Sequence, residues 1–217
     1  MERSARRELP PRVLMLVTDG VRRRGPAAIE DIVRDAVRGG VNIVQLREKH
    51  MAGAELVELG LRVRDVIAGE ALLFVNSDVE AAIALGADGV HLPDGAGSVA
   101  EVRARCGEGV LVSRSVHDAE AAVRAEREGA DFALLGTVFE TASKPGTRTI
   151  GVEGARAACN AVAIPVVAIG GITASNAARA IGAGAAGVAV IGALLDADDP
   201  LAAARSLAAA ISIATPV

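Results

Sequence analysis

Short apolar runs recur along the chain, and each of them ends in polar residues or glycine. Continuous apolar runs are typical of strands that are buried on both faces of a parallel sheet. The runs predict eight strands, at residues 13–17, 42–49, 72–75, 89–92, 110–113, 132–136, 166–169 and 187–191.

Between several of these runs, apolar residues repeat at the spacing of a helix. The spacing predicts helices over residues 29–37, 56–66, 79–85, 120–128, 173–182 and 201–211. Strands that alternate with helices are typical of an α/β fold, and eight strands in a chain of 217 residues predict a single (β/α)8 TIM barrel. We expect residues 12–217 to form this one domain and residues 1–11 to be a flexible leader.

The last two predicted strands both end at glycine. Gly170 and Gly171 follow the seventh strand, and Gly192 follows Ile191 at the end of the eighth. Glycine lets a phosphate group approach backbone N–H groups closely, and the phosphate site of a barrel usually lies after strands seven and eight. The pattern therefore predicts phosphate binding at Gly170 with Gly171 and at Ile191 with Gly192.

Two other stretches place polar side chains at strand ends. Gln45, Arg47 and Lys49 alternate along the second predicted strand, so that all three share one of its faces. Two cations on a face that lines a barrel mouth indicate an anionic ligand. The loop 137–149 is the longest polar insertion after any predicted strand. Loops at this end of a barrel carry its chemistry, so we expect a lid or a ligand clamp.

Composition and charge exclude several classes of protein. The chain is 51% hydrophobic but only 1% aromatic, so its core must consist of Val, Ile, Leu and Ala. A net charge of -4 without a long basic tract speaks against nucleic acid as a partner. The absence of a run long enough for a membrane span or a signal peptide predicts a cytoplasmic protein without membrane contact. Cys106 and Cys159 lack metal-ligand spacing and are expected to be reduced thiols.

Four segments at successive strand ends are similar to those of a known family. They are Gln45-Leu46-Arg47-Glu48-Lys49, the stretch from Val75-Asn76 to His91-Leu92, the loop from Gly136 through Phe139-Glu140-Thr141 to Lys144-Pro145, and the stretch from Ile164-Pro165 to Gly170-Gly171-Ile172. Together they resemble the thiamine phosphate synthase family and its TenI-type paralogues over roughly residues 13–200. The resemblance implies a transferase that joins hydroxymethylpyrimidine diphosphate to thiazole phosphate, releases diphosphate and forms thiamine phosphate.

The resemblance also implies roles for particular residues. The pyrimidine diphosphate would be held by Gln45, Arg47, Lys49, Asn76 and Lys144, with hydroxyl groups from Ser115, Thr141 and Ser143. The thiazole phosphate would be held by Gly171 and the backbone near Ile191 and Gly192. The candidate catalytic residues are Lys144, Ser115 and His117. Cations and donors would stabilise the leaving diphosphate, while the pyrimidine carbocation needs a dry pocket.

The chain departs from the family pattern at the metal site. The synthase holds Mg²⁺ with two aspartates, and the matching positions here are Ser77 and Ala96, which leaves Asp94 as the candidate metal ligand. The TenI-type paralogue is a thiazole tautomerase that needs no metal. Its acid/base histidine falls at Thr137, so His117 would have to transfer the proton.

Three functions remain open at this point. The synthase is the leading hypothesis, because the full set of diphosphate-binding residues is present. The alternatives are a tautomerase without a cofactor, which acts on thiazole phosphate carboxylate, and a non-catalytic regulatory protein that binds thiazole phosphate or thiamine phosphate. In each case the partner is a small phosphorylated molecule. The oligomeric state stays open, with a homodimer as one of the forms.

Overall fold

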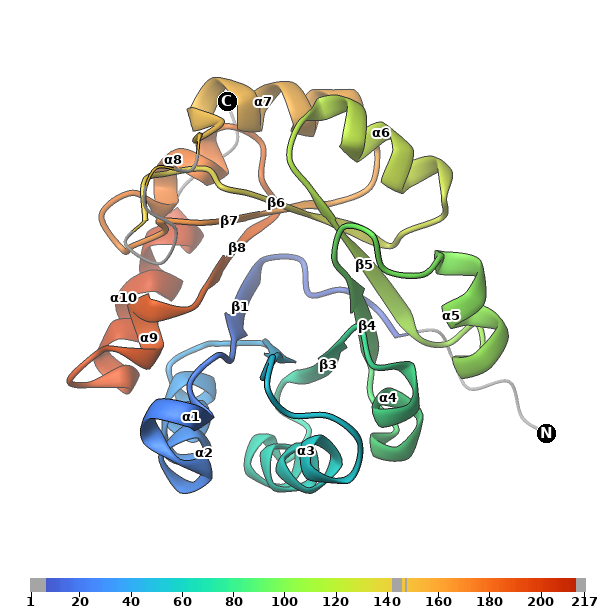
Figure 1. Ribbon diagram of the computed structural model, residues 1–217. Coiled ribbons are helices and arrows are strands. Elements are labelled where there is room, and N and C mark those ends of the chain that lie inside the picture. Colours follow the sequence, from blue (N-terminus) through green and yellow to red (C-terminus); the bar gives the residue numbers. More distant parts are fainter. Residues whose placement is uncertain (1–6, 142–145, 147, 214–217) are drawn as a thin grey trace.

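The computed structural model describes residues 7–141, 146 and 148–213 of the chain. These residues form eight parallel strands that close into a barrel in chain order, so that the first strand pairs with the last (Figure 1). The strands are β1 (Val13–Val17), β2 (Ile43–Leu46), β3 (Leu72–Asn76), β4 (Gly89–Leu92), β5 (Leu111–Val116), β6 (Phe132–Leu135), β7 (Val166–Ile169) and β8 (Gly187–Val190). The predicted (β/α)8 barrel is therefore confirmed.

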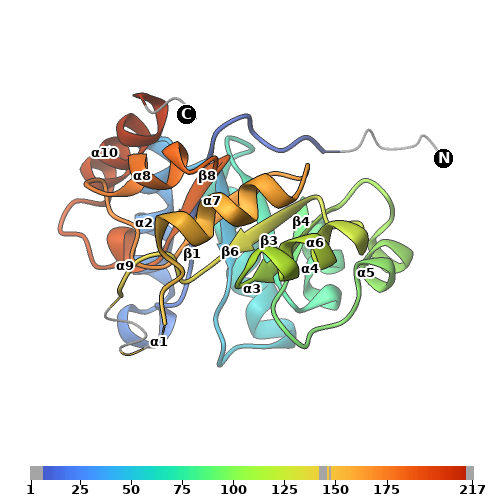
Figure 2. The same ribbon diagram turned by 90° about the horizontal axis from the view of Figure 1, so that it is seen from above.

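Helices surround this barrel on all sides (Figures 1 and 2). In chain order they are α1 (Val21–Arg24), α2 (Pro26–Arg38), α3 (Gly53–Ile67), α4 (Val79–Leu85), α5 (Val99–Cys106), α6 (Ala119–Arg127), α7 (Gly151–Ala161), α8 (Ala177–Gly182), α9 (Gly192–Leu195) and α10 (Pro200–Ile213). The last helix, α10, packs against α2 and completes the ring. Within the described residues, no helix has the length and apolar character that crossing a membrane requires.

Alternate residues of each strand serve two different cores. Val13, Met15 and Val17 of β1 point into the barrel, whereas the intervening leucines pack against the helices. Inside the barrel, the rings of Phe74 and Phe132 meet edge to face, with their centroids 5.6 Å apart. These side chains fill the interior, so the space for a ligand lies at the carboxyl ends of the strands.

Two strands, β2 and β5, end more than one residue away from their predicted bounds. Strand β2 ends at Leu46, because the backbone N–H of Arg47 donates to the Thr18 hydroxyl at 3.0 Å instead of continuing the ladder. The predicted strand extended to Lys49, which lies beyond the sheet. Strand β5 instead continues past its predicted end, because its pairing with β6 runs on to Val116. Periodicity alone therefore placed the strands correctly but not their ends.

Several helices have no residue bounds in the sequence-based prediction, namely α1, α5, α7 and α9. For α5 a signal was present, because Ser98 and Glu101 form a reciprocal capping box at its start. The predicted leader lies partly outside the described residues. In its described part, Arg7 forms an ion pair with Asp88 at 3.0 Å, and Leu9 packs against the inner core. Both cysteines are free thiols.

Candidate active site

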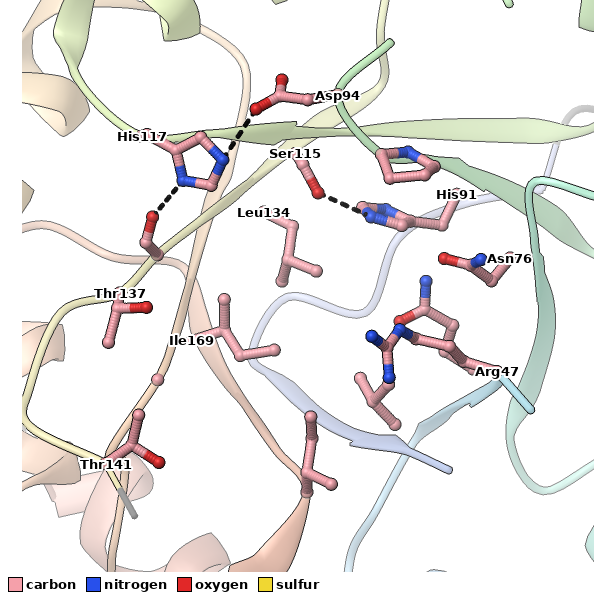
Figure 3. Close-up of a pocket in the computed structure, with 16 residues that line it drawn as sticks. Arg47, Asn76, His91, Asp94, Ser115, His117, Leu134, Thr137, Thr141 and Ile169 are labelled. Carbon is pink, nitrogen blue, oxygen red and sulfur yellow. Dashed lines mark hydrogen bonds and ion pairs between the residues drawn. The ribbon is translucent and has the colours of Figure 1, made fainter. Parts of the chain in front are cut away.

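A cavity of about 320 Å³ opens at the carboxyl ends of the strands (Figure 3). Every strand supplies part of its wall, either directly or through the residue that follows it. The strand and strand-end side chains are Val17, Gln45, Arg47, Asn76, His91, Ser115, Leu134, Ile169 and Ile191. We call this space the first cavity. Its wall combines polar groups from β2 to β5 with apolar side chains from β6 to β8.

Gln45 carries an unpaired polar atom in the wall of the first cavity. Its side chain points inward, as the period of two along β2 predicts, and only 1% of the residue is exposed. The side-chain nitrogen Nε2 has no hydrogen-bond partner in the described part of the chain. A buried donor without a partner costs about 1–3 kcal/mol. An acceptor atom of a bound ligand would remove that cost.

Arg47 and Asn76 lie on the same side of the first cavity (Figure 3). The guanidinium of Arg47 donates through Nη1 to the Asp19 carboxylate at 2.8 Å. Asn76 donates through its amide nitrogen to the Ser77 hydroxyl at 2.8 Å. The next residue, Asp78, caps α4 by accepting from the Ala81 N–H. The strand end therefore supplies both a cavity group and a helix cap.

His91 is a site residue that the sequence analysis missed. It is 3% exposed, and its ring contacts the Ser113 hydroxyl through Nδ1 at 2.8 Å and the Ser115 hydroxyl through Nε2 at 2.9 Å. Burial, together with the positive charges of Arg47 and Arg114, lowers the pKa of His91 to about 3. The neutral ring therefore donates to one serine and accepts from the other, which fixes the Ser115 hydroxyl at the cavity wall.

His117 and Asp94 contact each other on the opposite rim of the first cavity (Figure 3). The His117 Nε2 atom lies 2.8 Å from the Asp94 carboxylate, and its Nδ1 atom contacts the Gly136 carbonyl oxygen. Both of these partners are oxygen atoms that can accept a hydrogen bond. The sequence predicts separate roles for these two side chains. The structure instead joins them, so a change at one also alters the surroundings of the other.

A second cavity, of about 360 Å³, lies beside the first. Gly170 and Gly171 after β7, together with Ile191 and Gly192 after β8, form one part of its lining, and Arg23 forms another. The backbone N–H groups of Gly171 and Ile172 donate to no other group among the described residues. Those of Gly192 and Ala193 belong to the first turn of α9, where no earlier helical carbonyl can accept them. The predicted phosphate-binding backbone therefore faces one cavity.

Gly171 allows the loop after β6 to lie close to the end of β7. Its φ is +64°, and a Cβ atom there would lie 2.2 Å from the Glu140 carbonyl oxygen. The same loop is tied to β7, because the N–H groups of Val138 and Phe139 donate to the carbonyls of Ile169 and Gly170. Only glycine fits this position, because any side chain would push the two loops apart.

The remaining predicted site residues lie elsewhere. Thr141 lines both cavities. Lys49 is exposed and lines a separate pocket of about 280 Å³, which shares Arg47 and Asn76 with the first cavity. Ser143 and Lys144 lie outside the described residues.

The fit of Mg²⁺ can be judged from the carboxylates present. In the described residues, no three His, Cys, Asp or Glu side chains gather as a metal site. The Ser77 hydroxyl accepts from Asn76, and Ala96 offers only a carbonyl oxygen, which lies 3.4 Å from the Arg114 guanidinium. These residues do not fit a site of two aspartates. Among the described residues, a single carboxylate, Asp94, lines the first cavity, which fits an ion that a diphosphate ligand would also coordinate.

Fold and cavities together define a (β/α)8 barrel with a ligand site at the carboxyl ends of its strands. Comparison with known proteins then gives the family. The family described as "Thiamine monophosphate synthase" matches residues 14–194. With this match and the relatives described next, the chain belongs to the thiamine phosphate synthase/TenI family, as its sequence motifs predicted.

The relatives are thiamine-phosphate synthases. That of Methanoculleus marisnigri is 44% identical to this chain, over 89% of this chain and 92% of its own length. That of Chloroflexus aurantiacus is 41% identical, over 92% and 93%. The solved structure of a thiamine phosphate pyrophosphorylase from Pyrococcus furiosus matches with a TM-score of 0.83 and 35% identity, over 92% of this chain and 95% of that one. These relatives favour the synthase over the tautomerase and the non-catalytic binding protein.

Proposed function

We propose that this chain is a thiamine-phosphate synthase, a transferase of thiamine biosynthesis. It would join hydroxymethylpyrimidine diphosphate to thiazole phosphate and release diphosphate. The observation that carries the proposal is the pair of cavities at the barrel mouth, which share Thr141, Ile169, Gly170 and Ile191 in their linings. Two adjoining spaces suit a reaction between two substrates, whereas a tautomerase that acts on one thiazole phosphate needs only one.

The first cavity suits the pyrimidine diphosphate. The Gln45 amide can donate to it from a buried position. Among the described residues, the Arg47 guanidinium contacts only Asp19, through Nη1, which leaves its other donors for phosphate oxygens. Asn76, Ser115 and Thr141 add further polar groups to the wall. Lys49, Ser143 and Lys144 complete the set that the family resemblance implies.

The second cavity suits the thiazole phosphate. Backbone N–H groups of glycine residues after β7 and β8 face it, and such groups bind phosphate without a side chain. The phosphate would lie against Gly171 and Gly192, with Gly170 and Ile191 at the junction of the two cavities. The thiazole ring would then extend toward the first cavity.

The two substrates would react at the junction. The C–O bond between the pyrimidine methylene group and the diphosphate breaks, and its electron pair leaves with the diphosphate. The thiazole nitrogen then donates its lone pair to the methylene carbon and forms the new C–N bond. Arg47, Ser115 and Lys144 stabilise the charge on the leaving diphosphate. Leu134 and Ile169 line the wall and limit access of water to the pyrimidine cation.

Mg²⁺, the cofactor that the family resemblance implies, would supply further positive charge to the leaving diphosphate. We propose that Asp94 holds it, together with oxygens of the substrate. Asp94 would have to exchange its contact with His117 for the ion. No second carboxylate lines the first cavity among the described residues.

An assay with both substrates tests the proposal. Purified chain is mixed with both substrates and Mg²⁺, and thiamine phosphate and diphosphate are measured as products. We expect both products in equal amounts, and neither when one substrate is omitted. A parallel assay with thiazole phosphate carboxylate tests for isomerisation. Isomerisation without formation of thiamine phosphate would contradict the proposal and favour the tautomerase. Tight binding of thiazole phosphate without either reaction would favour the regulatory protein.

A further inference from the structure

Three consecutive arginines follow β1, and they lie differently with respect to the second cavity. Arg22, Arg23 and Arg24 form most of the short helix α1. Arg23 lines the second cavity together with Gly171 and Gly192, whereas Arg22 lines neither cavity. The sequence alone favours solvent-exposed charges in this loop. The structure instead brings one of them to the backbone groups that face the proposed phosphate.

In the described part of the chain, the charges around Arg23 do not balance, and one positive charge has no negative partner of its own. Arg23 and Arg24 both contact the same oxygen of Asp196, at 3.3 and 2.8 Å. The hydrogen bond from Arg24, with the nearby charge of Arg23, lowers the pKa of Asp196, so this carboxylate is ionised at neutral pH. One carboxylate balances only one guanidinium, and Arg24 makes the shorter contact.

The other carboxylates of the second cavity do not cancel this charge. Asp19 is already paired with Arg47 at 2.8 Å, and Glu140 is exposed to solvent. The side chain of Arg23 is 61% exposed, and an exposed ion pair of this kind contributes little stability. Arg23 can therefore leave Asp196 at small cost when a stronger anion is present.

The position of α1 is fixed by a buried carboxylate. Glu48, which is 3% exposed, accepts from the backbone N–H groups of Gly20 and Val21 at 3.1 and 3.2 Å. These groups lie at the start of α1, so Glu48 ties the helix to the end of β2. The backbone that carries Arg23 is thereby held beside the second cavity, and only the side chain has to move.

We propose that Arg23 supplies the side-chain cation for the phosphate ester of the substrate in the second cavity, and that it leaves Asp196 to Arg24 when this phosphate binds. The inference rests on the proposed function, because it takes the ligand of that cavity to be thiazole phosphate. It makes Arg23 a specificity-determining residue. A guanidinium can form a charge-assisted, bidentate contact with a phosphate, but it gains nothing from the unphosphorylated thiazole alcohol.

Calorimetry with two ligands tests this role. Dissociation constants for thiazole phosphate and for the thiazole alcohol are measured with the wild-type chain, Arg23→Gln and Arg22→Gln. We expect Arg23→Gln to weaken binding of thiazole phosphate roughly ten-fold or more and to leave binding of the alcohol unchanged. Arg22→Gln, the matched control, should bind both ligands as the wild type does. Equal effects of the two variants, or equal losses for both ligands, would overturn the inference.

Asp196→Asn separates ligand binding from a structural role of the ion pair. If Arg23 serves the phosphate, this variant should bind thiazole phosphate at least as tightly as the wild type, because a competing anion is gone. If it loses affinity as Arg23→Gln does, the ion pair merely holds the loops together and the inference fails. A wild-type chain that binds no thiazole phosphate would contradict the proposed function itself, and this inference with it.

Discussion

At the scale of single residues, Gln45 gives the most direct test of the first cavity. Its buried Nε2 atom has no partner among the described residues, so Gln45→Leu removes an unpaired donor and keeps an apolar side chain of similar size. In thermal unfolding without ligand, we expect this variant to be at least as stable as the wild type. We also expect its KM for the pyrimidine diphosphate to rise roughly ten-fold. A destabilised variant with an unchanged KM would show that Gln45 serves the fold.

His91 should make the stability of the fold dependent on pH. Its folded pKa of about 3 lies below the ordinary value of 6.5, so between these values the unfolded chain binds a proton that the folded chain does not. The stability that His91 contributes is therefore complete above pH 6.5 and is lost as the pH falls toward 3. The slope is at most roughly 1 kcal/mol per pH unit.

Urea unfolding of the wild type and of His91→Asn between pH 7 and pH 5 measures this slope. Because carboxylates also titrate on acidification, the informative quantity is the difference between the two chains. We expect this difference to shrink as the pH falls. Parallel pH profiles would mean that His91 has no lowered pKa in the folded state. If the variant does not fold, a second measurement on the wild type remains. The NMR signals of its His91 ring should not titrate between pH 8 and pH 5.

Single residues were predictable from sequence where local spacing decides their direction. Gln45 and Arg47 follow from the period of β2, and Gly170 and Gly171 follow from the end of β7. His91 has the same inward direction within β4, but its importance depends on Ser113 and Ser115 of the neighbouring strand. No pattern within one segment shows such a pairing, which arises only when the barrel closes.

At the scale of elements, the contact between the loops after β6 and β7 leaves no room for a side chain at Gly171. Gly171→Ala would place a Cβ atom 2.2 Å from the Glu140 carbonyl oxygen, so one of the two loops would have to move. Gly86 has a similar φ of +56°, but nothing lies within 4 Å of a Cβ atom there. Both substitutions carry the cost of a left-handed backbone, about 1–2 kcal/mol, and only the first adds a clash.

We expect Gly171→Ala to unfold at a lower temperature than Gly86→Ala and to lose binding of thiazole phosphate. Gly86→Ala should bind this ligand like the wild type. Thermal unfolding and calorimetry on the same two preparations measure both effects. If the two variants behave alike, the close approach of the loops has no role in ligand binding.

The ends of elements were harder to predict than their existence. Apolar runs showed where each strand begins to within one residue. The end of β2, however, lies where Arg47 and Glu48 bind the loop after β1. That contact joins segments that are far apart in the sequence. The prediction for Lys49 assumed a longer strand, so its direction could not be derived from a period of two.

At the scale of the whole molecule, the metal requirement depends on Asp94, the carboxylate that lines the first cavity. If Asp94 holds Mg²⁺ with the substrate, Asp94→Asn should need a higher Mg²⁺ concentration for its half-maximal synthase rate. Asp78→Asn is the matched control, because asparagine can still cap α4. The measurement is the synthase rate against Mg²⁺ concentration for the three chains. Identical curves would remove Asp94 from the metal site.

The barrel itself was predictable because each of its units repeats the same physical pattern. An apolar strand buried on both faces recurs eight times, and a barrel is the arrangement that buries all of these strands without a free edge. The division of the mouth into two cavities was not predictable. It depends on Thr141, Ile169 and Ile191, which line both cavities and come from the ends of different strands, so no single segment of the sequence specifies it.

The central claim is that each of the two cavities binds one substrate. The structure of the chain with bound thiamine phosphate, the product that spans both, tests it most directly. We expect the phosphate within hydrogen-bond distance of the Gly171 and Gly192 N–H groups, and the pyrimidine in the first cavity beside Gln45. A phosphate away from both glycines, or a product that lies in one cavity alone, would contradict it.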